Sequence, residues 1–139
     1  MESEQSSKEG RNNAFNPFFL YHSDHPGLVL VSKPLINDNN YYTWCRSMTI
    51  SLNAKNKLGF IDGTIQMPSA KSQLDDHALW KRCNDMILSW ILNSITPELA
   101  SSVIYSTTTQ EVWEDLRNRF SQSNAPRIFQ IERDIVCTS

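Results

Sequence analysis

The residues best suited to chemistry stand close together near the N-terminus, where His22 and His25 flank Asp24. Two imidazoles beside a carboxylate could ligate a metal ion or act as an acid–base pair. These residues run into the turn signal at 25–27 (HPG), however, and polar residues in such a place usually serve the turn itself. We interpret the trio as turn-forming residues and predict no metal site.

A second short motif, Asp62-Gly63-Thr64, has the residue types of an aspartic-protease loop in the wrong order, because that loop needs Asp, then Thr or Ser, then Gly. The sequence also lacks a glycine-rich phosphate loop, a nucleophile elbow and an HExxH pair. We therefore predict that the protein is not an enzyme. No catalytic, cofactor-binding or metal-binding residue is assigned, and no small-molecule substrate is expected.

Composition limits the partners and the compartment. Lys+Arg 13 against Asp+Glu 15 gives a net charge of -2, so no general attraction to nucleic acid or to an anionic membrane is expected. Cys45, Cys83 and Cys137 lack zinc-ligand spacing and are predicted to be reduced thiols. The chain has no apolar run of the roughly 18 residues that cross a bilayer, and MESEQSSKEG is no signal segment. We predict a cytoplasmic protein without a membrane partner.

The element expected to organise the fold is a helix from Ala78 to Ile95. Its apolar side chains cover about two thirds of a helical wheel, so it needs at least two packed neighbours. The predicted core anchors on this helix and its neighbours are Trp44, Met48, Leu52, Trp80, Ile87, Trp90, Ile91, Trp113, Leu116 and Phe120.

Helix-start signals divide the rest of the chain. Four capping residues at 37–40 precede an amphipathic segment, and the stretch TPE at 96–98 opens a short helix. Thr108 and Glu111 have the spacing of a capping box, and Pro126 opens a last segment with isoleucines at helical spacing. The predicted fold class is all-α, a compact bundle of about five helices.

Three regions are expected along the chain. Residues 1–13 are polar and predict a disordered leader, and residues 37–139 form the helical domain. Residues 14–36 predict an extended arm, in which the apolar run Leu28–Val31 could form one short strand. The arm should lie across a helical surface, its own domain's or a partner's. The candidate interface residues are Phe15, Phe18, Phe19, Leu20 and Ile50.

A set of features follows one order from about Asn16 to Ile135. They are NPFFLYHSDHPGLVLVSKPL, Asn40-Tyr41 and Trp44 with Met48 and Leu52, LGFIDG, Trp80, Asp85 and Trp90 through ILNSITPEL, and VIYSTTTQEVWEDLRNRFSQSNAPRIFQI. In this order and spacing they resemble the N-terminal gag region of plant Ty1/copia-type LTR retrotransposons. The resemblance implies a copia-like N-terminal arm and a capsid-like helical unit, similar to a retroviral capsid N-terminal half, that multimerises into the particle shell around the element's RNA.

The chain departs from the family pattern in two ways. The glycine that usually precedes the Asn-Tyr pair is absent, and the turn at 37–40 is one residue longer in its place. The second capsid-like half, the zinc knuckle, the protease, the integrase and the reverse transcriptase do not occur in the sequence. We expect a C-terminally truncated copy.

The resemblance favours a non-enzymatic, self-associating capsid-like domain that assembles into virus-like particles. The alternative is a monomeric protein-binding module derived from gag. Element RNA is expected to bind weakly if at all, because acidic residues are interleaved with the candidate arginines. The weak RNA-contact candidates are Arg117, Arg119, Arg127 and Arg133.

Overall fold

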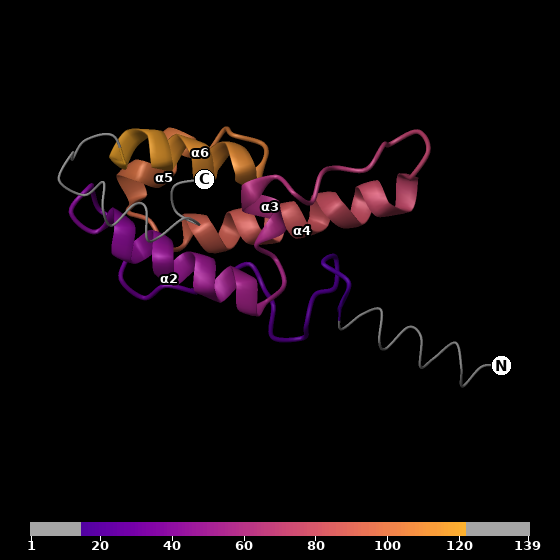
Figure 1. The fold of residues 1–139 in the computed structure, drawn as a ribbon, viewed down its shortest axis with the longest axis horizontal. Helices are drawn as coiled ribbons and strands as arrows, with labels where there is room; N and C mark the ends of the chain where they lie inside the picture. The colour runs from indigo at the N-terminus through magenta and orange to yellow at the C-terminus, as the bar shows by residue number, and fades with distance from the viewer. Residues whose placement is uncertain (1–14, 122–139) are drawn as a thin grey trace.

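The computed structural model of the protein describes residues 15–121, so the predicted leader and the segment that Pro126 opens lie outside the described residues. Its helices are α2 (Tyr41–Ala54), α3 (Gly59–Asp62), α4 (Leu74–Leu92), α5 (Pro97–Val103) and α6 (Thr109–Phe120). α4 is the longest and runs between α2 on one side and α5 and α6 on the other (Figure 1). The described residues contain helices and no strand, which confirms the predicted all-α fold.

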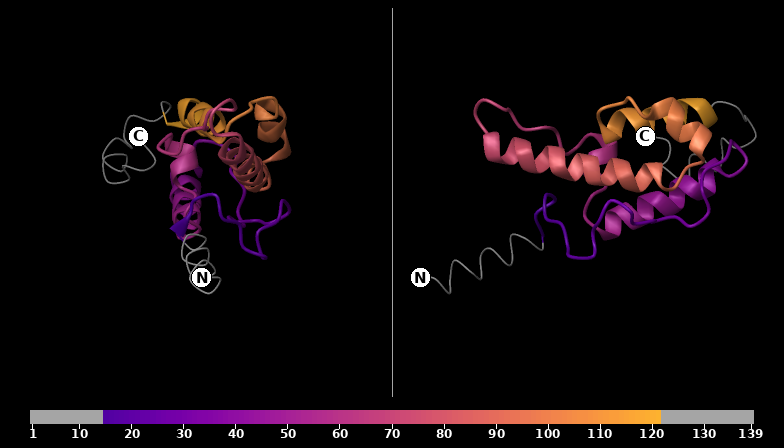
Figure 2. Two further views of the ribbon diagram at one scale, coloured as in Figure 1. Left: turned by 90° about the vertical axis from the view of Figure 1, so that its right-hand side faces the viewer. Right: turned by 180° about the vertical axis from the view of Figure 1, so that it is seen from behind.

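α4 begins at Leu74 rather than Ala78 and ends at Leu92 rather than Ile95. Its second half packs inside the bundle, whereas the start of its first half projects beyond the other helices, beside the loop that follows α3 (Figure 2). Leu79, which the sequence places on the apolar arc, is consequently 40% exposed. Nearer the middle of α4, the Trp80 ring meets the Phe60 ring of α3 with centroids 5.9 Å apart. No helix of the described part has both the length and the apolar character needed to cross a membrane.

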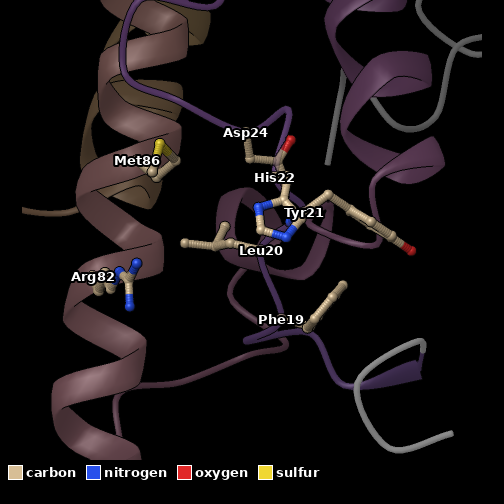
Figure 3. A pocket seen from close by; sticks show the side chains of 7 residues that line it. All are labelled: Phe19, Leu20, Tyr21, His22, Asp24, Arg82 and Met86. Carbon is tan, nitrogen blue, oxygen red and sulfur yellow. The ribbon is translucent and has the colours of Figure 1, made fainter. Parts of the chain in front are cut away.

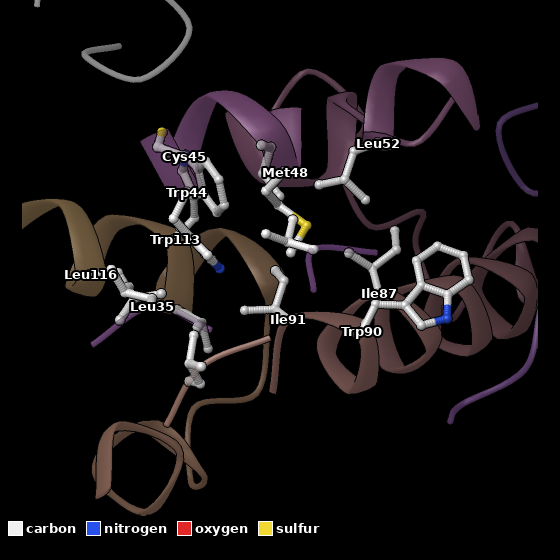
Figure 4. Close-up of a cluster of buried hydrophobic side chains, with 14 of the residues drawn as sticks. Leu35, Trp44, Cys45, Met48, Leu52, Ile87, Trp90, Ile91, Trp113 and Leu116 are labelled. Carbon is white, nitrogen blue, oxygen red and sulfur yellow. The ribbon is translucent and has the colours of Figure 1, made fainter. Parts of the chain in front are cut away.

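The core lies where α2, α4 and α6 meet (Figure 4). Trp44 of α2 packs against Trp113 of α6 with ring centroids 5.4 Å apart, and its Nε1 donates to the Ser94 carbonyl at 2.7 Å. Of the predicted core anchors, Phe120 is partly buried and the others are buried. Burying a large apolar side chain contributes about 1.5–3 kcal/mol, so this cluster supplies much of the driving force for folding.

The start of α6 follows the sequence signal closely. The Thr108 hydroxyl accepts from the Glu111 amide at 3.2 Å, and the Glu111 carboxylate accepts from the Thr108 amide at 3.1 Å, which confirms the predicted capping box. Pro97 is likewise the first residue of α5, as predicted.

The chain before α2 is extended, but the short strand considered at Leu28–Val31 does not form. The β pairing among the described residues is a single parallel bridge between Leu35 and Ile95. In it the Leu35 amide donates to the Ser94 carbonyl at 2.9 Å, and the Thr96 amide donates to the Leu35 carbonyl at 3.1 Å. The apolar run at 28–31 meets no partner strand, so its sequence pattern cannot produce a sheet.

Cys83 is a free, buried thiol, which agrees with the prediction of a reduced thiol at this position. Cys45 is buried on α2, and Cys137 lies outside the described residues.

Candidate functional site

The arm, residues 15–36 in the described chain, is bound to the protein's own helices. The Cys83 thiol of α4 donates to the Phe18 carbonyl at 3.1 Å, and Trp90 Nε1 donates to the His25 carbonyl at 2.8 Å. Hydrogen bonds to backbone carbonyls fix the path of an extended segment without a sheet. The arm thus packs in cis, and Trp90 both anchors the core and holds the arm.

Asp24 fastens the middle of the arm. Its Oδ1 lies 2.6 Å from Lys55 Nζ, and its Oδ2 accepts from the Tyr21 amide at 2.9 Å. The Asp24 side chain is only 1% exposed, and Lys55 Nζ also lies 5.3 Å from the centre of the Trp90 ring. Both carboxylate oxygens are therefore engaged in holding the fold.

The histidines beside Asp24 do not join it in a site. His22 and His25 are exposed, and within the described residues no cluster of three His, Cys, Asp or Glu side chains could hold a metal ion. Asp62 and Thr64 likewise form a local turn, in which Asp62 Oδ1 accepts from the Thr64 amide at 2.9 Å. The turn interpretation of the trio fits the geometry, because the Asp24 amide donates to the Tyr21 carbonyl at 2.9 Å.

Lys57 is a buried cation that sequence reasoning missed. It is 1% exposed, and its Nζ donates to the Phe19 carbonyl at 2.7 Å and to the Lys55 carbonyl at 3.3 Å. Burial lowers the pKa of the Lys57 ammonium, because desolvation disfavours its charged form. Burial also raises the pKa of the neighbouring Cys83 thiol, which keeps that thiol protonated and unreactive.

A helix-end motif turns Lys57 inward. Asn56 has the left-handed φ of 58°, and the Lys57 amide donates to the Leu52 carbonyl at 2.8 Å. This is the pattern of a Schellman motif with asparagine in the left-handed position. Asn56 after an amphipathic helix is the sequence signal that could have revealed the turn.

A hollow of about 430 Å³ lies between the arm and α4 (Figure 3). The arm and α4 line it with Phe19, Leu20, Tyr21, His22, Asp24, Arg82 and Met86. Because Asp24 is already engaged, the polar side chains left in the lining are the exposed Tyr21, His22 and Arg82. Such a lining suits contact with a polypeptide side chain better than bond-making chemistry.

The candidate interface residues fall into two groups. Phe15 is 79% exposed and Ile50 is 53% exposed, so both remain available for contact. Phe18, Phe19 and Leu20 are partly buried by the protein itself. The Phe18 ring, for example, meets the Phe60 ring edge-on with centroids 6.2 Å apart.

The candidate arginines are not gathered into one basic surface by the described residues. Arg119 forms hydrogen bonds with both carboxylate oxygens of Asp115, at 2.8 Å and 3.2 Å, and with the Ser102 hydroxyl at 2.8 Å. Arg117 lies on the same helix, and Arg127 and Arg133 lie outside the described residues. The Arg119 charge is thus offset by a neighbouring acid.

The projecting half of α4 carries exposed apolar side chains that the sequence did not single out as a surface. Leu74 is 65% exposed, and Met67 in the accompanying loop is 53% exposed. Periodicity predicts a helix here, but it does not tell how far neighbouring elements extend along it.

Comparison with known proteins finds one matching family model and similar curated proteins. A family model described as the gag polypeptide of LTR copia-type elements matches residues 21–69. This match covers the arm from Tyr21, α2, α3 and the start of the loop after α3. No solved structure matches the chain.

Two curated proteins of Arabidopsis thaliana are similar over most of the chain. The retrovirus-related Pol polyprotein from transposon RE2 is 27% identical over 121 residues, which cover 75% of this chain and 8% of that protein. The Pol polyprotein from transposon RE1 is 26% identical over 107 residues, covering 72% of this chain and 7% of that protein. The chain therefore spans less than a tenth of the length of these relatives.

Proposed function

Because this chain is a copia-type gag region of the kind carried by plant LTR retrotransposons, we propose that it is a capsid-like structural unit that associates with copies of itself in virus-like particles. The match to the copia-type gag model carries the proposal. The family recognised from the sequence is confirmed by that match. The gag family is structural and non-catalytic, and we extend that property to this chain.

The described contacts support a structural unit rather than a reactive one. Three groups attach the arm to the helices. The carboxylate of Asp24 pairs with Lys55, the ammonium of Lys57 donates to the Phe19 carbonyl, and the thiol of Cys83 donates to the Phe18 carbonyl. A unit that assembles by non-covalent contacts needs a rigid body and an exposed apolar surface. Phe15, Ile50 and the first half of α4 offer such surface.

Element RNA is a secondary partner in this proposal. Arg119 is paired with Asp115, and the net charge of the whole chain is -2. Any RNA binding should therefore be weak and fall steeply with salt. The absence of a membrane or small-molecule partner and the cytoplasmic location stay predictions from the sequence.

The test is the mass of the purified chain in solution over a wide concentration range, measured by light scattering, with electron microscopy of the heaviest fraction. Growth into dimers, rings or particles is the expected result. A strict monomer at every concentration would contradict the proposal. A monomer that retains one defined protein from an extract would instead favour the alternative, a gag-derived binding module.

A further inference from the structure

The helices hold the arm largely by its main-chain carbonyls. Asn93 Nδ2, at the end of α4, donates to the Pro26 carbonyl at 2.7 Å and to the Leu28 carbonyl at 3.2 Å. Asn56 Nδ2, after α2, donates to the Phe15 carbonyl at 3.0 Å. Such donors fix the path of a segment whether or not it belongs to the same molecule. We call the side chains that hold the arm the arm seat: Lys55, Asn56, Lys57, Cys83, Trp90 and Asn93.

The arm follows α4 in a fixed register, because turns shorten it to match the rise of the helix. The Asp24 amide donates to the Tyr21 carbonyl at 2.9 Å, and the Leu28 amide donates to the His25 carbonyl at 3.1 Å. An extended chain would advance about 3.3 Å per residue, against about 1.5 Å for a helix. The arm seat therefore fits one compact conformation of this segment. The hydrogen-bonded pairs, each 65 residues apart in sequence, are Phe18 with Cys83, His25 with Trp90, and Leu28 with Asn93.

The arm seat also selects its occupant by charge and shape. The Asp24 carboxylate, only 1% exposed, lies 2.6 Å from Lys55 Nζ, and the Phe18 ring meets the Phe60 ring edge-on. A peptide without an acid at this place would leave the Lys55 charge partly buried and unpaired, which is unfavourable. A second copy of the chain carries the same acid, aromatic ring and turns at the same spacing. Its arm therefore satisfies every partner in the arm seat.

The link between the arm and the rest of the chain is short and exposed. Val31 is 8% exposed and Leu35 is 0% exposed, whereas the residues between them, Ser32, Lys33 and Pro34, are all exposed. Within the described chain, none of these three makes a backbone-to-backbone hydrogen bond. The chain bends at Ser32 and Lys33, although the residue before a proline favours extended backbone. Straightening this link would turn the arm away from its own helices.

We propose that the arm seat accepts residues 15–31 of a second copy, so that two copies exchange arms about the link at 32–34. Every contact of the arm is then kept, but it is made between molecules instead of within one. The exchange is isologous, because each copy gives its arm to the other about a twofold axis. This inference rests on the proposed self-association and names the segment that joins the copies.

Concentration decides which copy fills the arm seat. A short link keeps the arm near its own seat at an effective concentration of about 1 mM. A dilute chain should therefore hold its own arm, as in this structure. Copies packed side by side in an assembly reach comparable concentrations, where exchange competes with the closed form. Arm exchange thus follows from crowding the copies together and then locks them to one another.

The test is charge complementation between two chains, read as mass by sedimentation velocity. Asp24→Lys and Lys55→Asp each place like charges together, both in the closed form and in an exchanged homodimer. In an equimolar mixture refolded together from urea, only an exchanged heterodimer restores opposite charges in both seats. We expect this heterodimer at concentrations at least about tenfold below those at which wild type dimerises, because the competing closed form is lost. A mixture that keeps the monomer mass at every concentration would overturn the exchange.

Two controls separate arm exchange from a general effect of charge. The double variant Asp24→Lys/Lys55→Asp restores the pair within one chain and should have the mass of wild type. Asp115→Arg and Arg119→Asp reverse an ion pair whose members both lie on α6, so mixing these two chains cannot restore it. No heterodimer is expected from that mixture. A heterodimer there would show that charge reversal alone causes association, and it would overturn the assignment to the arm seat.

A second measurement leaves the ion pair of the arm intact. Phe15 is 79% exposed and its carbonyl is held by Asn56, so Phe15→p-benzoylphenylalanine places a photoreactive group beside the arm seat without disturbing the core. This chain is illuminated at high concentration with an isotope-labelled wild-type chain, and the products are mapped by mass spectrometry. Cross-links to residues near Asn56 of the labelled chain are expected. Cross-links confined to the photoreactive chain itself would overturn the exchange.

These outcomes differ from those of the proposed function. If wild type associates while the complementary mixture stays monomeric, arm exchange is wrong and self-association stands. If the mixture forms heterodimers while wild type stays monomeric at every concentration, arm exchange stands and self-association of the natural chain is wrong.

Discussion

The two halves of α4 belong to one continuous helix but differ in how deeply their apolar side chains are buried. In the second half Cys83, Ile87, Trp90 and Ile91 are each 0% exposed. In the first half Leu79 is 40% exposed. The second half lies in the core with side chains of α2 and α6, and the arm is hydrogen-bonded to α4 at Cys83 and Trp90. One helix can therefore build the core at one end and present a surface at the other.

The largest expected effect that sharpens this comparison is Trp90→Ala. Losing a fully buried aromatic costs about 3–5 kcal/mol, and the His25 carbonyl also loses its donor. Leu79→Ala on the first half is the matched control and should cost less than about 1 kcal/mol. Urea unfolding followed by circular dichroism measures both. Equal losses would mean that the two halves are equally buried in solution.

The arm's ion pair gives the next effect. Asp24→Asn removes the charge that faces Lys55 and should cost about 2–3 kcal/mol, below the value for a wholly buried pair because Lys55 keeps 22% exposure. The control is Asp115→Asn, which breaks the half-exposed pair with Arg119 on α6 and should cost about 0.5 kcal/mol or less. Equilibrium unfolding compares them, and a larger loss at Asp115 would contradict a structural role for the arm.

Much of the fold could be predicted because its signals are local. The capping box of Thr108 and Glu111 and the proline at the start of α5 depend on neighbouring residues alone. The role of the capping residues at 37–40 was harder to predict. Asn40 Oδ1 accepts from the Ile36 amide at 3.0 Å, so this side chain closes the preceding turn instead of capping α2. One residue type serves both purposes, and sequence does not separate them.

The candidate site was less predictable because it depends on distant contacts. Lys57 follows a helix, and its sequence position predicts a solvated cation. Its ammonium instead donates a hydrogen bond to the Phe19 carbonyl of the arm, 38 residues away. Leu79 fits an apolar arc and is exposed because the bundle ends beside it. The spacing of apolar residues predicts a helix and its apolar face. How far the neighbouring elements extend along that face depends on tertiary packing, which this spacing does not give.

Lys57 also predicts a pH dependence. Its pKa in the folded protein is lowered from 10.5, so in the pH range just below 10.5 the unfolded chain binds more protons than the folded one. Stability should therefore rise with pH across that range in wild type relative to Lys57→Met. Burial raises the pKa of Tyr41, so Tyr41 contributes a slope of the opposite sign to the pH dependence of stability. This contribution is present in both proteins and cancels when they are compared. Unfolding free energies at several pH values would reveal the slope, and parallel profiles would contradict it.

The smallest expected change in stability is at the tip of α4. Leu74 is 65% exposed, so Leu74→Ser should alter the unfolding free energy by no more than about 0.5 kcal/mol. The same substitution removes an exposed apolar side chain from the surface that the first half of α4 offers for the proposed self-association, and it should weaken association measurably. Thermal melting and sedimentation equilibrium on one sample give both values. A variant that melts early would place Leu74 in the core, and one that associates like wild type would remove it from the contact. The expected split, unchanged folding with weaker association, is what distinguishes a surface held for a partner from a helix end that is merely left uncovered.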